Sequence, residues 1–276
     1  MNKTKNHLDY AADNILSARK QIATATQLYS NEISNSIKNS IVYESLFDDA
    51  KGSEPDVKLV QTDTKSAALA CHDAYPDAKI AVLNFASYNN PGGGFTTGSN
   101  AQEEMLCRES TLYPVISNEA FDSYYNYNRS YNKYGLYGSR AIYSPNIIWT
   151  DANGQKLGTS DVITCAAPNA NVYLPPTLDL YSYSYIEETH ADLDIAMLER
   201  MQLVKAIAED QQVDALVLGA WGCGAFGFNA LKVADDWRKT FEKGTSIKHL
   251  VYAVYDKPYT HNYDAFVQVL GGKADQ

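Results

Sequence analysis

The sequence has little cysteine, little histidine and no long apolar run. Its four cysteines, Cys71, Cys107, Cys165 and Cys223, are far apart and form no Cys-x-x-Cys pair. In a chain of 276 residues this pattern indicates reduced, mostly buried thiols rather than a disulfide framework or a zinc site. None of the five histidines lies in the two glycine-rich stretches described below, so we assign them no role. No stretch of about 18 uncharged apolar residues occurs, so we expect neither a transmembrane helix nor a membrane partner.

A secretory signal and an excess of basic charge are also lacking. The N-terminal stretch MNKTKNHLDYAADNIL has no apolar core, which favours a cytoplasmic location. The net charge of −10 argues against a broad nucleic-acid-binding face, although a local pocket for an anion remains compatible with it. With 45% hydrophobic and 20% charged residues, the chain has enough apolar side chains to bury a large core.

Strand-like apolar runs alternate with helical patterns along the chain. Residues 1–50 have helix-like spacing, and we expect a helical extension packed on a core domain of residues 51–276. In that domain we expect strands at 57–62, 79–85, 162–168, 213–221 and 249–256, a hairpin at 141–158, and helices at 66–76, 101–116, 193–212, 230–244 and 260–272. Pro76 should close the first of these helices, and the region of Pro114 should end the second. The alternation predicts an α/β sandwich with strands buried on both faces.

Many of the 21 tyrosines cluster between residues 119 and 141. This segment, EAFDSYYNYNRSYNKYGLYGSRA, is rich in Tyr, Asn, Ser and Gly and has no clear apolar period. We interpret it as a long excursion on the surface.

Two glycine-rich stretches each follow an apolar strand and precede a helix. They are PGGGFTTGSN (91–100) and GAWGCGAFGFN (219–229). Ligands of open α/β sheets bind beyond the carboxyl ends of the strands, and glycine lets a ligand approach the backbone closely. Exposed amides in such loops favour a phosphate. The alternative is a pair of tight connections without a ligand. Neither stretch fits a P-loop or a Rossmann dinucleotide fingerprint.

Glu103 and Glu104 lie ten residues beyond the first glycines, at the start of an expected helix. Acidic residues are favoured in a first helical turn by the helix dipole, which is the simpler explanation. Neighbouring helical residues differ by about 100° in direction, so we expect that the two carboxylates do not face one atom and have different tasks. One would protonate a leaving group and the other would hold hydroxyls, as for a glycosidic bond beside a pyrophosphate.

These residues resemble the signature of the bacterial-type poly(ADP-ribose) glycohydrolases. The motifs that carry the resemblance are NFAS at 84–87, NPGGG at 90–94, AQEE at 101–104 and LCRES at 106–110. The second loop, GAWGCGAFG at 219–227, also resembles the second ligand loop of that family, and the likeness extends from about Val57 to Leu270.

The resemblance implies a macrodomain-like three-layer α/β/α sandwich with a mixed central sheet. It implies hydrolysis of the ribose–ribose O-glycosidic bonds of poly(ADP-ribose), with release of ADP-ribose and without a cofactor or a metal. Glu104 would be the catalytic acid and, as a carboxylate, would then activate the attacking water. Glu103 would hold ribose hydroxyls. The partner would be ADP-ribose or poly(ADP-ribose) on modified macromolecules.

The resemblance also implies a set of substrate-binding residues. The three glycines would allow close passage of the pyrophosphate and distal ribose, the second loop would form the other wall, and Phe226 would pack on a ribose. Either Asn89 or Asn90 would orient the distal ribose, and Gln102 would position the glutamates. The full set is Asn89, Asn90, Gly92, Gly93, Gly94, Gln102, Gly222, Gly224, Ala225, Phe226 and Gly227.

Two other functions are compatible with these motifs. The first is a macrodomain that binds ADP-ribose and cleaves nothing. The second is a hydrolase of a different ADP-ribosyl linkage, to protein or to nucleic acid. Under each of these functions the tyrosine-rich segment would be an ordinary insertion or a lid that stacks on adenine.

Overall fold

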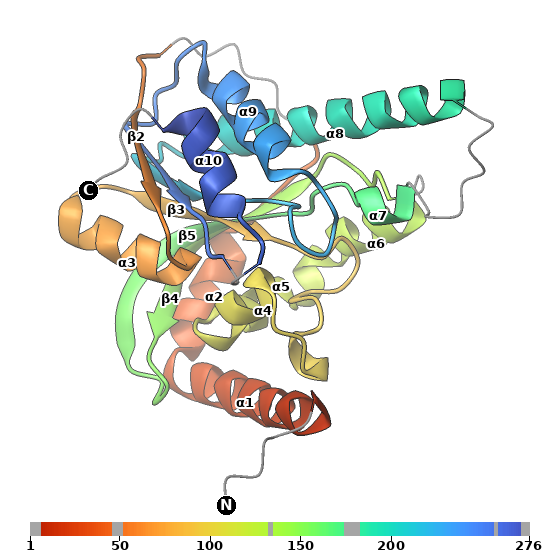
Figure 1. The fold of residues 1–276 in the computed structure, drawn as a ribbon. Coiled ribbons are helices and arrows are strands. Elements are labelled where there is room, and N and C mark those ends of the chain that lie inside the picture. Colours follow the sequence, from red (N-terminus) through yellow and green to blue (C-terminus); the bar gives the residue numbers. More distant parts are fainter. Residues whose placement is uncertain (1–6, 46–51, 132–134, 174–182, 257–258, 272–276) are drawn as a thin grey trace, which may run out of the picture.

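The computed structural model describes residues 7–45, 52–131, 135–173, 183–256 and 259–271. A β-sheet lies at its centre (Figure 1). The sheet has seven strands in the order β1-β4-β5-β3-β6-β7-β2. Because β4 runs antiparallel to β1 and β5 while the other neighbours are parallel, the sheet is mixed. The strands are β1 (Ile41–Tyr43), β2 (Asp56–Val60), β3 (Ile80–Phe85), β4 (Ala141–Thr150), β5 (Lys156–Cys165), β6 (Ala215–Leu218) and β7 (His249–Ala253).

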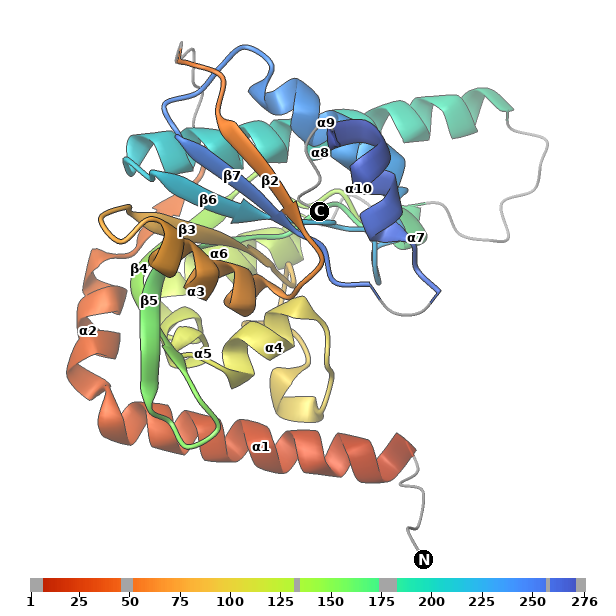
Figure 2. The same cartoon turned by 60° about the vertical axis from the view of Figure 1, so that its left-hand side comes forward.

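Helices cover both faces of this sheet. Figure 2 shows α8, α9 and α10 on one side and α3, α4 and α5 on the other. The helices are α1 (His7–Leu28), α2 (Ser30–Asn39), α3 (Thr64–Ala74), α4 (Gln102–Arg108), α5 (Leu112–Ile116), α6 (Asp122–Ser130), α7 (Ala170–Tyr173), α8 (Tyr183–Asp210), α9 (Ala230–Phe241) and α10 (Asn262–Leu270), with short 3₁₀ turns η1 (Phe95–Thr97) and η2 (Glu119–Phe121). Within the described ranges, no helix combines the length and apolarity that a bilayer span requires.

The two sides of the sheet carry separate hydrophobic cores. Successive residues of a strand point to opposite faces. In β3, Ala81 and Leu83 pack into the core under α8, α9 and α10. Ile80 and Val82 pack into the core under α1 to α6. The expected three-layer α/β/α sandwich with strands buried on both faces is thus confirmed.

The predicted hairpin is confirmed and is longer than expected. β4 and β5 pair antiparallel, and the turn is held by the Asp151 carboxylate, which accepts N–H bonds from Asn153 and Gln155 at 2.8 Å each. The expected strand at 162–168 overlaps the end of β5, which stops at Cys165. The helix expected from residue 193 begins at Tyr183, and residues 41–43, expected to be helical, form β1 instead.

The single helix expected at 101–116 is wrong. It is divided into α4 and α5; the end expected in the region of Pro114 is found at Ile116, and Pro114 itself lies inside α5. Proline is tolerated in a first helical turn, where its missing N–H is not needed. The break occurs because the chain pairs with the end of β4: Thr111 N donates to Ile148 O at 3.0 Å and Thr150 N donates to Glu109 O at 2.8 Å.

The expected surface excursion at 119–141 is wrong for much of the described segment. Residues 122–130 form α6, which has the buried residues Tyr124, Tyr125 and Asn128. Phe121, just before α6, is buried as well. Tyr137 is also buried. Residues 132–134 of this segment lie outside the described residues. The interpretation of the segment as a lid over adenine stays a prediction.

The N-terminal helices pack on the core. Ala18 and Ala25 of α1 belong to the hydrophobic core on that side of the sheet. Asn14 Nδ2 donates to Gly98 O at 3.0 Å, and Gln21 Nε2 donates to Ser110 O at 3.1 Å. α1 therefore contacts the chain on both sides of Glu103 and Glu104. The division into an extension (1–50) and a domain (51–276) stays a prediction; β1, which lies before residue 50, joins the sheet.

Substitution Gly98→Ala should weaken the docking of α1. Gly98 has a φ of +97°, and a Cβ there would lie 2.7 Å from Ala11 O in α1. We expect a loss of about 1–3 kcal/mol in the free energy of unfolding, measured by urea denaturation. Gly224→Ala is the matched control, since a Cβ there meets no atom within 4 Å. Equal unfolding midpoints for the two variants would contradict the prediction.

Candidate active site

The predicted site residues gather at one edge of the sheet. β3 is parallel to both β5 and β6, so the three strands end at the same edge. A Cβ on Gly219, the first residue after β6, would lie 3.2 Å from Cζ of Phe85, the last residue of β3. The two glycine loops therefore begin side by side, where open α/β sheets bind ligands.

Glu103 is a buried carboxylate that is held by three N–H donors. Its Oε2 accepts from Ser87 N at 2.6 Å, and its Oε1 accepts from Gly92 N at 3.1 Å and from Asn84 Nδ2 at 3.3 Å. Only 3% of the residue is exposed. Burial raises the pKa of Glu103 to about 8, against the opposing effect of the Ser87 N–H bond. Glu103 thus links Ser87, which precedes the glycines, to Gly92 in the first glycine-rich stretch.

Glu104 is held by two backbone N–H groups, one for each oxygen. Oε1 accepts from Gly94 N at 2.8 Å and Oε2 accepts from Ala101 N at 2.9 Å. The bond to Ala101, the N-cap residue of α4, is one half of a capping box. Glu104 thus accepts a hydrogen bond at the start of its helix, while the helix-dipole explanation for its presence stays a prediction.

The expectation that the two carboxylates do not face one point is wrong. Gly93 has a φ of +58°, and a Cβ built on it would lie 2.5 Å from Glu104 Oε1 and 3.1 Å from Glu103 Oε2. Helical direction sets where Cβ atoms point, but the longer glutamate side chains bend toward the loop backbone that supplies their donors. Only glycine fits at position 93, because the backbone there lies against both carboxylates.

Gln102 fastens the start of α4 to β3. Its Oε1 accepts from Phe85 N at 2.9 Å, and its Nε2 donates to Leu83 O at 2.9 Å and to Thr64 Oγ1 at 3.1 Å. The Gln102 side-chain amide thus forms hydrogen bonds with backbone groups near the end of β3. This contact fits the predicted positioning role of Gln102, which stays a prediction.

The segment Ser87–Asn90, which we term the lead-in loop, is folded on itself. Ser87 Oγ donates to Asn89 Oδ1 at 3.0 Å and accepts from Asn90 N at 3.3 Å. Asn90 O accepts from Gly93 N at 2.9 Å. Asn90 is exposed and Asn89 is half-buried. Both asparagines lie beside the glycines, and the choice between them as the ribose-orienting residue stays open.

The second glycine loop is held by the segment that follows β5. Asn171 Nδ2 donates to Ala225 O and Ala170 N donates to Phe226 O, both at 2.9 Å. The Gly227 amide donates to Gly224 O at 3.1 Å. Among the described residues, no acceptor faces four amides of the loop, which are those of Gly222, Gly224, Ala225 and Phe226. Within the described part of the chain, these four N–H groups could therefore donate to an anion.

Sequence reasoning missed several residues of the site. Asn84 and Ser87 belong to the quoted motifs, but nothing in their spacing shows that they donate to Glu103. For Asn171, the only signal in the sequence is the Asn-Ala-Asn stretch after β5. Tyr125 on α6 is buried close to Glu103: burial raises its pKa well above the ordinary value, and the Glu103 carboxylate raises it further. Only the fold brings that tyrosine to the site.

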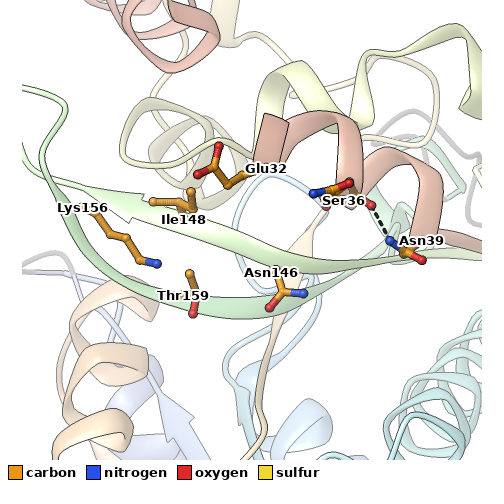
Figure 3. A pocket seen from close by; sticks show the side chains of 8 residues that line it. Glu32, Ser36, Asn39, Asn146, Ile148, Lys156 and Thr159 are labelled. Atoms are coloured by element: carbon orange, nitrogen blue, oxygen red, sulfur yellow. Dashed lines mark hydrogen bonds between the residues drawn. The ribbon is translucent and has the colours of Figure 1, made fainter. Parts of the chain in front are cut away.

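A pocket lies away from the glycine loops, between α2 and the β4–β5 hairpin (Figure 3). Its volume is about 300 Å³. It is lined by Glu32, Asn35, Ser36, Asn39, Asn146, Ile148, Lys156 and Thr159. None of the predicted site residues lines this pocket.

The fold and the site together define a macrodomain-like protein, and comparisons with known proteins name its family. Residues 11–151 match the family described as microbial-type PARG, catalytic domain, where PARG is poly(ADP-ribose) glycohydrolase. That match spans half of the chain. The chain therefore belongs to the microbial-type PARG family. No curated protein sequence matches the chain.

Solved structures of bacterial PARGs are similar over almost the whole chain. PARG from Thermomonospora curvata is 25% identical, with a TM-score of 0.78 over 93% of this chain and 99% of that one. The same enzyme bound to the inhibitor ADP-HPD is 26% identical, with a TM-score of 0.76 over the same shares. PARG from Deinococcus radiodurans in complex with ADP-ribose is 29% identical, with a TM-score of 0.73 over 86% of this chain and 96% of that one.

The raised pKa of Glu103 predicts a pH-dependent stability. Between its usual pKa of 4.5 and the folded value of about 8, the folded protein holds a proton that the unfolded chain releases. The contribution of Glu103 to the free energy of unfolding is therefore fully present below the lower value and is lost as the pH rises through the upper one. Urea denaturation over this range should show a flatter pH dependence for Glu103→Gln than for the unmodified protein.

The matched control for this measurement is Glu109→Gln. Glu109 lies just after α4 and pairs with Lys65 at 3.4 Å, away from the glycine loops. Other groups that face Glu103 are Glu104 and Cys107 on α4 and Tyr124 and Tyr125 on α6. Parallel curves for Glu103→Gln and the unmodified protein would mean that Glu103 is ionised in the folded state.

Proposed function

We propose that this PARG-family chain hydrolyses the ribose–ribose O-glycosidic bonds of poly(ADP-ribose) and releases ADP-ribose, with Glu104 as general acid and base. The observation that carries the proposal is the position of the two buried carboxylates against the backbone of Gly93, within the first glycine loop. A chain that only binds ADP-ribose gains little from two carboxylates whose burial is costly. The similarity to PARG structures that hold ADP-ribose or an inhibitor supports the choice of substrate.

The number of unused lone pairs supports the division of tasks. A carboxylate has about four lone-pair positions. Among the described residues, two N–H donors occupy those of Glu104 and three occupy those of Glu103. Glu104 therefore retains one position on each oxygen, enough to carry a proton and to contact a second oxygen. Glu103 retains one position in all; below its pKa of about 8 this position carries the proton, which suits a single hydrogen bond donated to a ribose hydroxyl.

In the proposed reaction the Glu104 carboxylic acid protonates the oxygen of the departing ribose as the glycosidic C–O bond breaks. The positive charge that develops on the remaining ribose is next to two carboxyl groups. The Glu104 carboxylate then takes a proton from a water molecule, whose oxygen bonds to that carbon. This restores the acid, so each cycle consumes one water and leaves one new hydroxyl on each product.

The pyrophosphate would lie between the two glycine loops. The four available amides of the second loop are donors suited to phosphate oxygens. Phe226 is half-buried, and it packs at the margin of the core beneath α9, which would leave part of its ring for a ribose. The macromolecule that carries the ADP-ribose would remain outside this site.

Substitution Glu104→Gln should reduce kcat on poly(ADP-ribose) by about 10²–10⁴-fold, because it removes the transferable proton. Glu103→Gln should act mainly on KM, because it removes a contact to bound ribose. Glu109→Gln is the control and should match the unmodified enzyme. Release of ADP-ribose, followed by chromatography, measures all three variants. Full activity of Glu104→Gln would refute the assignment, and a larger kcat loss in Glu103→Gln would transfer the acid role to Glu103.

The substrate is tested separately with a panel. Poly(ADP-ribose), mono-ADP-ribosylated protein and ADP-ribosylated nucleic acid are offered to the purified protein, and calorimetry measures its affinity for ADP-ribose. We expect turnover of the polymer. Turnover of another substrate alone would assign a different ADP-ribosyl linkage, and binding without any turnover would make the chain a reader.

A further inference from the structure

The lead-in loop sets the geometry of Glu103 through one short contact. Ser87 N lies 2.6 Å from Glu103 Oε2, the shortest of the five N–H contacts to the glutamate pair. A displacement of Ser87 would therefore change both the direction and the protonation of this carboxyl.

An aromatic pair contacts the lead-in loop at Tyr88. The Tyr88 ring stacks on the ring of Tyr137, with centroids 3.8 Å apart and planes 7° from parallel. Tyr137 comes from the tyrosine-rich segment, is 4% exposed, and has a φ of +56°. A bulky residue rarely adopts that backbone conformation, and it persists only where surrounding contacts impose it. The ring of Tyr137 is thus held in a fixed place against the loop.

A buried arginine imposes the conformation of Tyr137. Arg200 of α8 is 1% exposed. Its Nη2 donates to Leu136 O, and its guanidinium lies 5.9 Å from the centroid of the Tyr137 ring. The Tyr137 hydroxyl is hydrogen-bonded to the Asn169 side chain. Because this buried guanidinium donates to a backbone carbonyl, it fastens the chain just before Tyr137 to α8.

A second arginine holds the same loop one residue further on. Arg129 of α6 donates from Nη1 to Asn89 O at 2.5 Å and from Nη2 to Asn126 Oδ1. The loop is therefore gripped at consecutive residues, Tyr88 through its ring and Asn89 through its carbonyl. Both contacts come from the tyrosine-rich segment, and neither involves Glu103 or Glu104.

We propose that Tyr88 and Tyr137, which we term the aromatic clamp, are positioning residues that fix the lead-in loop so that Ser87 N meets Glu103 and the loop asparagines face the substrate. The inference rests on the proposed function for its kinetic consequences. It gives the tyrosine-rich segment a task in the site that requires no contact with adenine. The clamp acts through stacking, so the aromatic rings matter and the Tyr88 hydroxyl does not.

The test compares Tyr88→Ala, Tyr88→Leu and Tyr88→Phe. We expect Tyr88→Ala to lower kcat by about 10–100-fold, since a displacement of about 1 Å in a site has this order of effect. Tyr88→Phe should restore most of the loss. Tyr88→Leu keeps apolar volume without a stacking face and should resemble Ala. The fall of stability with pH that belongs to Glu103 should extend to higher pH in Ala and Leu, because the Ser87 N–H bond lowers the pKa of Glu103.

The matched control is Tyr75→Ala. Tyr75 stacks on His249 with the same centroid separation of 3.8 Å, and it lies after α3, away from the loop. The substitution Tyr75→Ala removes an equivalent stacking contact and leaves the lead-in loop unchanged. If Tyr88→Ala and Tyr75→Ala show the same kcat and the same pH dependence of stability, the clamp is overturned. The clamp is also overturned if Tyr88→Phe loses as much activity as Tyr88→Ala.

Hydrogen exchange gives a readout that does not depend on catalysis. Peptides that cover residues 86–94 should exchange faster in Tyr88→Ala than in the unmodified protein, and unchanged exchange would refute the clamp. Tyr75→Ala should leave these peptides unaffected. If the unmodified protein shows no turnover of poly(ADP-ribose), the proposed function fails, while this measurement still decides on the clamp.

Discussion

Two buried carboxylates determine the course of the first glycine loop. A carboxylate removed from water needs hydrogen-bond donors in place of its lost hydration. Four of the five donors here are backbone amides, and they come from Ser87 before the glycines, from Gly92 and Gly94 within them, and from Ala101 after them. The loop therefore wraps around the carboxylates. Three features follow from this one requirement. They are the close approach of the backbone at position 93 to both carboxylates, the presence of glycine there, and the fixed orientation of the glutamates.

The sheet supplies the rigidity of this arrangement. Gln102 fastens α4 to the end of β3, and α4 cannot extend because residues 109–111 pair with β4 instead. On the other side, the second loop is fastened to the segment after β5 by Asn171. Each part of the site is thus connected to a different strand of one sheet. A site built on such elements keeps its geometry better than one built on loops alone.

The sequence predicted the parts of this structure that depend on local pattern. Strand-like runs, the hairpin turn at Asp151 and the glycine loops at strand ends are signals of this kind. The division at 109–111 was not predictable, because it depends on pairing with β4, which is distant in the sequence. The buried face of α6 has helical spacing at 121, 124, 125 and 128, but the polar Asn128 and the surrounding Tyr and Asn residues hide it. The donors of the glutamates were also hidden, because backbone amides leave no trace in a sequence pattern.

The helix-capping and catalytic explanations of Glu104 are compatible in physical terms. The N–H groups of Gly94 and Ala101 donate hydrogen bonds to its two carboxyl oxygens. A general acid becomes ionised when it gives up its proton, so the same two donors stabilise the charge that develops on Glu104 in the proposed reaction. They are in place before the reaction and need no reorganisation during it. The capping bond that makes Glu104 look ordinary in the sequence would therefore assist its proposed chemistry.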